Sequence, residues 1–126
     1  MRRAADRVAD VLLAVAHPPL AAAPAPPARV LAFAREFRFS FSRLRVPAGP
    51  VRIQLKNLGE DDHDLRVVDA KGVVRVRTRV LHPDDLGDVR VRLPRGRYRF
   101  YCSLADHEAR GMAGTFTVTA PRPRAS

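Results

Sequence analysis

The sequence predicts an all-β protein, a Greek-key antiparallel β-sandwich of seven or eight strands. Three observations predict this fold. Short segments alternate apolar and polar residues, as strands with one buried face do. Turn-forming residues separate these segments, and no long stretch has the period of an α-helix. The alternating segments are residues 36–41, 51–57, 63–68, 74–80, 89–93, 97–101 and 115–119.

Turn signals lie between the segments in chain order. Residues 47–50 contain two prolines and a glycine before the second segment, and residues 57–59 end that segment. Residues 69–72 form a turn after the third segment, and residues 94–96 lead into the sixth. Residues 82–85 hold one histidine and two aspartates, which we interpret as a turn rather than a second metal site.

The chain has 126 residues, which predicts one domain. We expect residues 30–120 to form it, residues 1–29 to be a non-globular leader with a Pro-Ala-rich linker, and residues 121–126 to be a short basic tail. An arginine pair followed by a short apolar run at residues 11–16 is typical of an export signal, although two aspartates make this one atypical. An ordinary short helix or a disordered extension is the alternative.

An atypical export signal predicts an extracytoplasmic location, whether periplasmic, cell-surface or secreted. The apolar run is too short to cross a bilayer, so we expect no transmembrane segment. The net charge is +10, but only two of the 23 basic residues are lysines, Lys56 and Lys71. Such an arginine bias is what a GC-rich genome produces, so we give the charge no weight. We expect no nucleic-acid partner, because aromatic residues do not interleave a basic patch and no recognition helix is predicted.

The residues with the most distinctive chemistry lie at the end of the sixth segment. Cys102 is the only cysteine, His107 follows after four residues, and Met112 follows after four more. A thiolate, an imidazole and a thioether suit copper, or alternatively zinc, better than magnesium or calcium. A trigonal copper site needs a second histidine, and His63 at the start of a predicted strand is the best candidate. Loops cluster at the two ends of a sandwich, so these residues can meet there.

Each of these residues also has an ordinary structural interpretation. A lone cysteine is usually core packing, a lone methionine is usually filler, and either histidine could be a strand-end or loop residue. The combination, closed by a Gly-Met-x-Gly sequence at residues 111–114, favours a metal site. Cys102 with His107 also resembles a thiol nucleophile with its base, but a small sandwich offers no obvious cleft for a hydrolase. The acidic run at residues 60–64 lacks the spaced oxygens and glycine of a calcium loop.

Three stretches resemble the cupredoxin family of small blue copper proteins, which includes plastocyanin and azurin. The resemblance covers residues 30–120 and depends on Asn57-Leu58-Gly59 with His63-Asp64-Leu65, on residues 94–102, and on His107 with residues 111–118. It implies one type 1 copper ion, with His63, Cys102 and His107 as trigonal ligands and Met112 as the axial ligand.

The resemblance also implies roles for residues beside the ligands. Asn57 and Asp64 are expected to lie just outside the ligands, and Asp64 is expected to tie neighbouring loops together. Family members with this loop often have Pro-Gly before the second histidine, where this chain has Ala105 and Asp106. This difference affects how rigid the loop is expected to be, and it adds the charge of Asp106 beside the copper.

The implied function is a monomeric carrier of single electrons between redox partners, not an enzyme. One alternative is a copper-handling protein of the cell envelope without fast electron transfer. Another is a metal-free sandwich that binds an anionic surface. We expect arginines on two strands to form a basic face, which could dock an acidic redox partner by electrostatic steering. These are Arg75, Arg77, Arg79, Arg90 and Arg92.

Overall fold

The computed structural model describes residues 26–123, which form nine β-strands and no helix. The predicted leader lies almost entirely outside the described residues, so the export signal stays a prediction. Residues 26–123 contain no helix that could cross a membrane. The strands are β1 (Ala28–Arg35), β2 (Arg38–Phe41), β3 (Arg45–Pro47), β4 (Gly49–Asn57), β5 (Arg66–Val68), β6 (Val74–Arg77), β7 (Leu86–Leu93), β8 (Gly96–Tyr101) and β9 (Ala113–Thr119).

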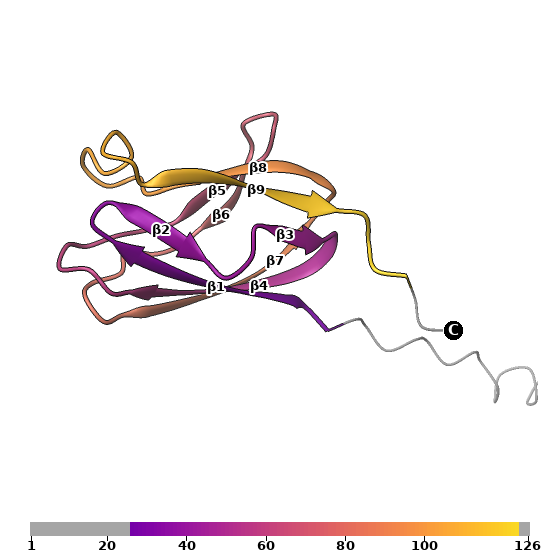
Figure 1. The fold of residues 1–126 in the computed structure, drawn as a ribbon, viewed down its shortest axis with the longest axis horizontal. Coiled ribbons are helices and arrows are strands. Elements are labelled where there is room, and N and C mark those ends of the chain that lie inside the picture. Colours follow the sequence, from indigo (N-terminus) through magenta and orange to yellow (C-terminus); the bar gives the residue numbers. More distant parts are fainter. Residues whose placement is uncertain (1–25, 124–126) are drawn as a thin grey trace, which may run out of the picture.

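Two sheets pack face to face, which confirms the all-β sandwich (Figure 1). One sheet has the strand order β2-β1-β4-β7, and the other has the order β3-β9-β8-β5-β6. The sheets are mixed rather than purely antiparallel, because β1 pairs with β4 and β3 pairs with β9 in parallel. Alternation predicts which face of a strand is buried, but it carries no information on strand direction.

The first part of the domain differs from the predicted strand at residues 36–41. Residues Glu36 and Phe37 form a tight turn, and Arg35 pairs with Arg38 across it. The strand before the turn, β1, begins at Ala28, two residues before the predicted start of the domain. Its buried face carries mostly alanine, a weak apolar signal, and this explains why alternation in the sequence did not indicate a strand there.

The core lies between the sheets and consists of alternate residues from both. Val51, Ile53 and Leu55 of β4 are buried, and the polar residues between them face outward. Burying each such aliphatic side chain contributes about 1.5–3 kcal/mol. An aromatic layer joins the two sheets, in which Phe41 of β2 stacks on Phe100 of β8 with ring centroids 4.2 Å apart.

Gly114 lies beneath this aromatic layer. A Cβ atom at this position would lie 2.4 Å from Cζ of Phe100, well inside van der Waals contact. We therefore expect Gly114→Ala to lower the free energy of unfolding by about 1–3 kcal/mol, because the ring must shift within a packed core. Denaturant unfolding measures this change, with Thr115→Ala on the exposed side of the same strand as the control. Equal losses in the two variants would contradict the packing described.

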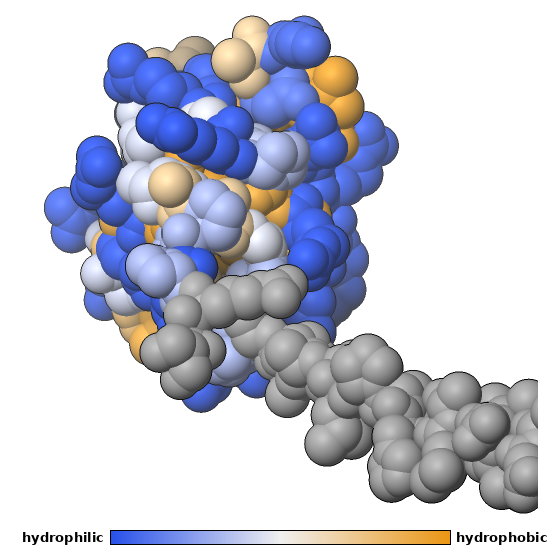
Figure 2. All heavy atoms as spheres, turned by 90° about the vertical axis from the view of Figure 1, so that its right-hand side faces the viewer, coloured by the Kyte–Doolittle hydropathy of each residue, from blue (hydrophilic) through white to orange (hydrophobic). Residues whose placement is uncertain are grey.

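The loops at one end of the sandwich are residues 36–37, 58–65, 78–85 and 102–112, which we call the metal end. The loop between β8 and β9 projects at the left in Figure 1, away from both termini of the drawn domain. Viewed from the opposite end, hydrophilic residues dominate the visible surface (Figure 2).

Candidate metal centre

The loop between β8 and β9 is closed by the backbone of the residues predicted to bind metal. Strands β8 and β9 pair up to Tyr101 and Ala113, so the loop leaves and re-enters the same ladder. The N–H of Cys102 donates to the carbonyl of Met112 at 3.1 Å, and the N–H of Met112 donates to the carbonyl of His107 at 3.0 Å. The three predicted ligands of this loop are therefore tied to one another by their backbones.

His63 comes from a separate loop, between β4 and β5. Its backbone makes two hydrogen bonds with Leu81, of 3.0 and 2.7 Å. The buried side chain of Asn57 donates to the carbonyls of Asp61, at 2.8 Å, and Leu81, at 2.9 Å, and it accepts the N–H of Gly59 at 2.8 Å. Asn57 thus holds the loop that carries His63.

The structure brings His63, Cys102 and His107 together at the metal end. Their candidate ligand atoms all lie within 4.8 Å of one another. Sγ of Cys102 is 4.0 Å from Nδ1 of His63 and 3.5 Å from Nδ1 of His107. Metal–thiolate and metal–imidazole bonds of about 2.3 and 2.0 Å, separated by 120°, place sulfur and nitrogen about 3.7 Å apart. The observed spacing therefore fits a metal ion held by all three residues.

Several solved structures resemble this chain in fold. Auracyanin A, a blue copper protein from the green thermophilic photosynthetic bacterium Chloroflexus aurantiacus, is 18% identical with a TM-score of 0.67, over 75% of this chain and 100% of that chain. Auracyanin B is 24% identical with a TM-score of 0.63, over 79% and 93%. Reduced rusticyanin is 20% identical with a TM-score of 0.59, over 77% and 82%.

The chain has the cupredoxin fold. No protein-family model and no curated protein matches the sequence. The two imidazoles and one thiolate, buried at one end of this cupredoxin sandwich, are the donor set of a type 1 copper ion and fit one such ion.

Met112 is completely buried, like His63 and Cys102, and it directly precedes β9. Its backbone contacts place it beside both loop ligands. A weak thioether ligand is the usual fourth donor of a blue copper site. Met112 as the axial ligand stays a proposal.

Asp64 joins the two segments that carry the ligands. It follows His63, and its buried carboxylate accepts hydrogen bonds from the N–H of Ser103, at 2.6 Å, and from the Ser103 hydroxyl. Ser103 in turn follows Cys102. The guanidinium of Arg66 lies 3.5 Å from the same carboxylate. Asp64 therefore fixes the distance between the His63 loop and the start of the Cys102 loop.

Asp106 directly precedes His107 in the sequence and lies at the surface of the loop. Its exposed carboxylate pairs with Arg110 at 2.7 Å. The hydrogen bond from Arg110 holds the pKa of Asp106 below its usual range. The two residues are four apart within one tight loop, and this proximity turns the carboxylate toward the surface.

Glu36 is a contributor to the site that the sequence did not indicate. Its carboxylate accepts the N–H of Glu60 at 2.8 Å and the N–H of Asp61 at 2.6 Å, and it lies 3.2 Å from Nε2 of His63. These hydrogen bonds, above all that from Asp61, lower the pKa of Glu36 to about 2. Glu36 stands 27 positions before His63 in the sequence, so no local motif links them.

Burial favours the protonated form of the Cys102 thiol in the metal-free protein. Burial raises the pKa of Cys102, while the backbone N–H groups of Asp64 and Leu104 oppose this rise by favouring the thiolate. A metal binds the thiolate, so binding must release a proton. We expect the affinity for Cu(II) to rise by up to about tenfold per pH unit between about pH 7 and 8.5, as long as the thiol is protonated in the metal-free protein. Competition with a chelator at several pH values measures this slope, and a flat profile would contradict it.

Among the four predicted ligands, His107 lies nearest the surface. It is 7% exposed, whereas His63, Cys102 and Met112 are 0% exposed. The Phe37 ring covers one side of it, with ring centroids 5.1 Å apart, and the Arg110 guanidinium lies over that ring. Nε2 of His107 lies 3.7 Å from the carboxylate of Asp61. One edge of this imidazole therefore leads from the buried site to the outside of the cupredoxin sandwich.

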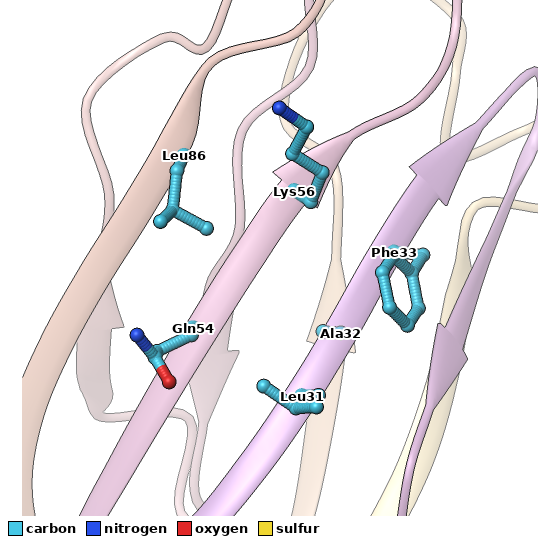
Figure 3. Close-up of a pocket in the computed structure, with 6 residues that line it drawn as sticks. All are labelled: Leu31, Ala32, Phe33, Gln54, Lys56 and Leu86. Atoms are coloured by element: carbon cyan, nitrogen blue, oxygen red, sulfur yellow. The ribbon is translucent and has the colours of Figure 1, made fainter.

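A hollow of about 310 Å³ lies on the outer face of the four-stranded sheet (Figure 3). Its lining is mainly apolar, and none of the predicted ligands belongs to it. The amine of Lys56 donates to the carbonyl of Asp84 at 2.6 Å. The hollow therefore holds no group arranged for chemistry and is separate from the metal centre. It is lined by Leu31, Ala32, Phe33, Gln54, Lys56 and Leu86.

Proposed function

We propose that this chain is a monomeric, extracytoplasmic type 1 copper protein that carries single electrons between redox partners. The observation that carries the proposal is the convergence of Nδ1 of His63, Sγ of Cys102 and Nδ1 of His107 in a buried site of a cupredoxin fold. A bound copper ion would supply a reversible one-electron change between Cu(I) and Cu(II). The proposal is for a carrier rather than an enzyme.

The protein's own contribution is a rigid, dry ligand set. His63 is held through Asn57 and Leu81, and Cys102 is held through Met112 and the contact of Ser103 with Asp64. Ligands fixed in this way cannot follow the different geometries that Cu(I) and Cu(II) prefer in solution, so little needs to reorganise when an electron moves. The apolar surroundings and the hydrogen bonds to sulfur tune the potential.

Copper handling is the main alternative, and it would use the same ligands. The complete burial of three of the four candidate ligands supports retention over release. The copper-loaded protein is expected to be reduced and reoxidised repeatedly, with rapid electron exchange between molecules, and to keep its copper beside a competing apo-acceptor. Rapid transfer of copper to the acceptor with slow electron exchange would favour handling. Retention on an anionic surface, unchanged by removing copper or mutating Cys102, would favour the metal-free alternative.

The arginines predicted to form a docking face are distributed over two edge strands. Arg75 and Arg77 of β6 and Arg90 and Arg92 of β7 are exposed, and these strands are the edges of the two sheets. Arg79 lies beyond β6 and pairs with Asp85 at 3.1 Å, so its charge is largely offset. Docking of an acidic partner on this face stays a proposal, and it would place that partner along the side of the sandwich.

The loops of the metal end carry the opposite charge. They contain nine carboxylates and only two arginines, Arg79 and Arg110, although the whole chain has a net charge of +10. A partner that docks over His107 therefore meets an acidic surface and is expected to be basic.

Removing negative charge from the metal end distinguishes docking over His107 from docking on the arginine face. With a basic redox partner at low salt, we expect Asp61→Asn with Asp62→Asn to slow electron exchange by about tenfold, since steering is lost. Arg90→Gln with Arg92→Gln is the matched control and should leave the rate near the wild-type value. The reverse pattern, with an acidic partner preferred, would support docking on the arginine face instead. Stopped-flow kinetics over a range of salt concentrations measures both.

A further inference from the structure

Glu36 occupies a position in the structure that links the β1–β2 turn to the loop of His63. One oxygen, Oε1, is within hydrogen-bond distance of three nitrogens on that loop. Two are the backbone N–H groups of Glu60 and Asp61, and the third is Nε2 of His63. The single carboxylate thus holds both the path of the loop and the orientation of the imidazole.

The loop lets this carboxylate approach closely because Gly59 has no side chain. A Cβ atom at Gly59 would lie 2.4 Å from Oε1 of Glu36, so any larger residue there would displace it. The side chain of His63 is completely buried, and that of Glu36 is 27% exposed. The imidazole consequently has one polar neighbour on each nitrogen: the carboxylate of Glu36 at Nε2 and the sulfur of Cys102 at Nδ1, 4.0 Å away.

An ionised carboxylate only accepts hydrogen bonds, so the nitrogen that faces it must carry the proton. A neutral imidazole has one protonated nitrogen, which leaves Nδ1 with a free lone pair directed at the site. A carboxylate behind a metal-binding histidine also raises the basicity of the ligand nitrogen. Both effects act on His63 before any metal arrives.

We propose that Glu36 is a positioning residue, which fixes the Nε2-protonated tautomer and the ring orientation of His63 so that Nδ1 is ready to bind copper. This inference rests on the proposed function for the identity of the metal. The tautomer itself is a property of the metal-free chain and can be measured without copper.

Nitrogen-15 NMR of the histidine rings in the metal-free protein tests the first half. The wild type is expected to carry the His63 proton on Nε2. Glu36→Gln keeps a carbonyl oxygen at the same place and should retain that tautomer, whereas Glu36→Ala should populate the Nδ1-protonated form. Glu60→Gln is the matched control, because it removes the same charge from the adjacent loop and leaves the backbone N–H in place. A wild-type proton on Nδ1, or the same tautomer in Glu36→Ala and the control, would overturn the proposal.

Copper affinity tests the second half. Competition titration with Cu(II) should give a dissociation constant about 10–100-fold larger for Glu36→Ala than for the wild type, with a smaller change for Glu36→Gln and none for Glu60→Gln. Circular dichroism shows whether each variant is folded. If Glu36→Ala does not fold, Glu36→Gln serves as the test. Wild-type binding with unchanged affinity in both Glu36 variants would overturn this inference alone. Failure of the wild type to bind Cu(II) would overturn the proposed function as well.

Discussion

Cys102→Ala is expected to abolish the blue colour of the copper-loaded protein and to remove specific Cu(II) binding. The colour of a type 1 site comes from charge transfer between the thiolate and Cu(II), and Cys102 is the only cysteine in the chain. The substitution also leaves two imidazoles without the soft donor that selects copper. Visible absorption during a Cu(II) titration measures both effects.

Cys102→Ser is the companion variant, because serine is nearly isosteric and should leave the sandwich intact. It is expected to be colourless while its metal-free form keeps the circular dichroism of a β-sandwich. Since Cys102 is fully buried, an unfolded Cys102→Ala variant would not decide the matter alone, whereas a folded and colourless Cys102→Ser variant does. A blue Cys102→Ser variant would show that the sulfur is not a ligand.

Asp64→Ala should produce the largest loss of stability among the residues around the site. It removes two hydrogen bonds to Ser103 and leaves Arg66 without its buried carboxylate partner. Breaking a buried ionic and hydrogen-bonded contact costs about 3 kcal/mol of unfolding free energy. The Cys102 and His63 segments would also lose their link, so Cu(II) affinity should fall together with stability.

Two controls accompany this prediction in denaturant unfolding of the metal-free protein. Asp64→Asn retains an acceptor and a donor for Ser103 and should lose less. Asp88→Ala removes a partly exposed pair with Arg52, with 2.6 Å between the charged atoms, and should cost about 1 kcal/mol or less. If Asp64→Ala and Asp88→Ala were equally stable, Asp64 would not join the two ligand segments.

The sandwich could be predicted from the sequence because its strands each have one buried face. Residues 51–57 alternate strictly, and the structure places β4 over them and two residues further back, at Gly49–Asn57. Two features of the sandwich could not be predicted from the sequence. One is β1, whose inward side is mostly alanine, and the other is the parallel pairing of β1 with β4. Neither burial of small residues nor strand direction leaves a periodic signal in the sequence.

The convergence of His63, Cys102 and His107 was also predictable, for a chemical reason. Few kinds of functional site require a cysteine, a histidine and a methionine along one loop. A copper site of this kind also needs a second histidine, which limits the candidates for the remaining ligand. Glu36 could not be found in this way, because its role depends on a turn that packs against a loop far along the chain. The pairing of the Asp106 carboxylate with Arg110, four residues later, could not be told from the sequence either.

The most direct measurement is a titration of the purified wild-type chain with Cu(II), followed by visible absorption and electron spin resonance. Binding through His63, Cys102 and His107 predicts one copper per chain, an intense blue colour that saturates at that ratio, and a spin-resonance spectrum with strong thiolate character. A colourless protein, or a spectrum of copper bound by nitrogen and oxygen alone, would contradict the metal centre described.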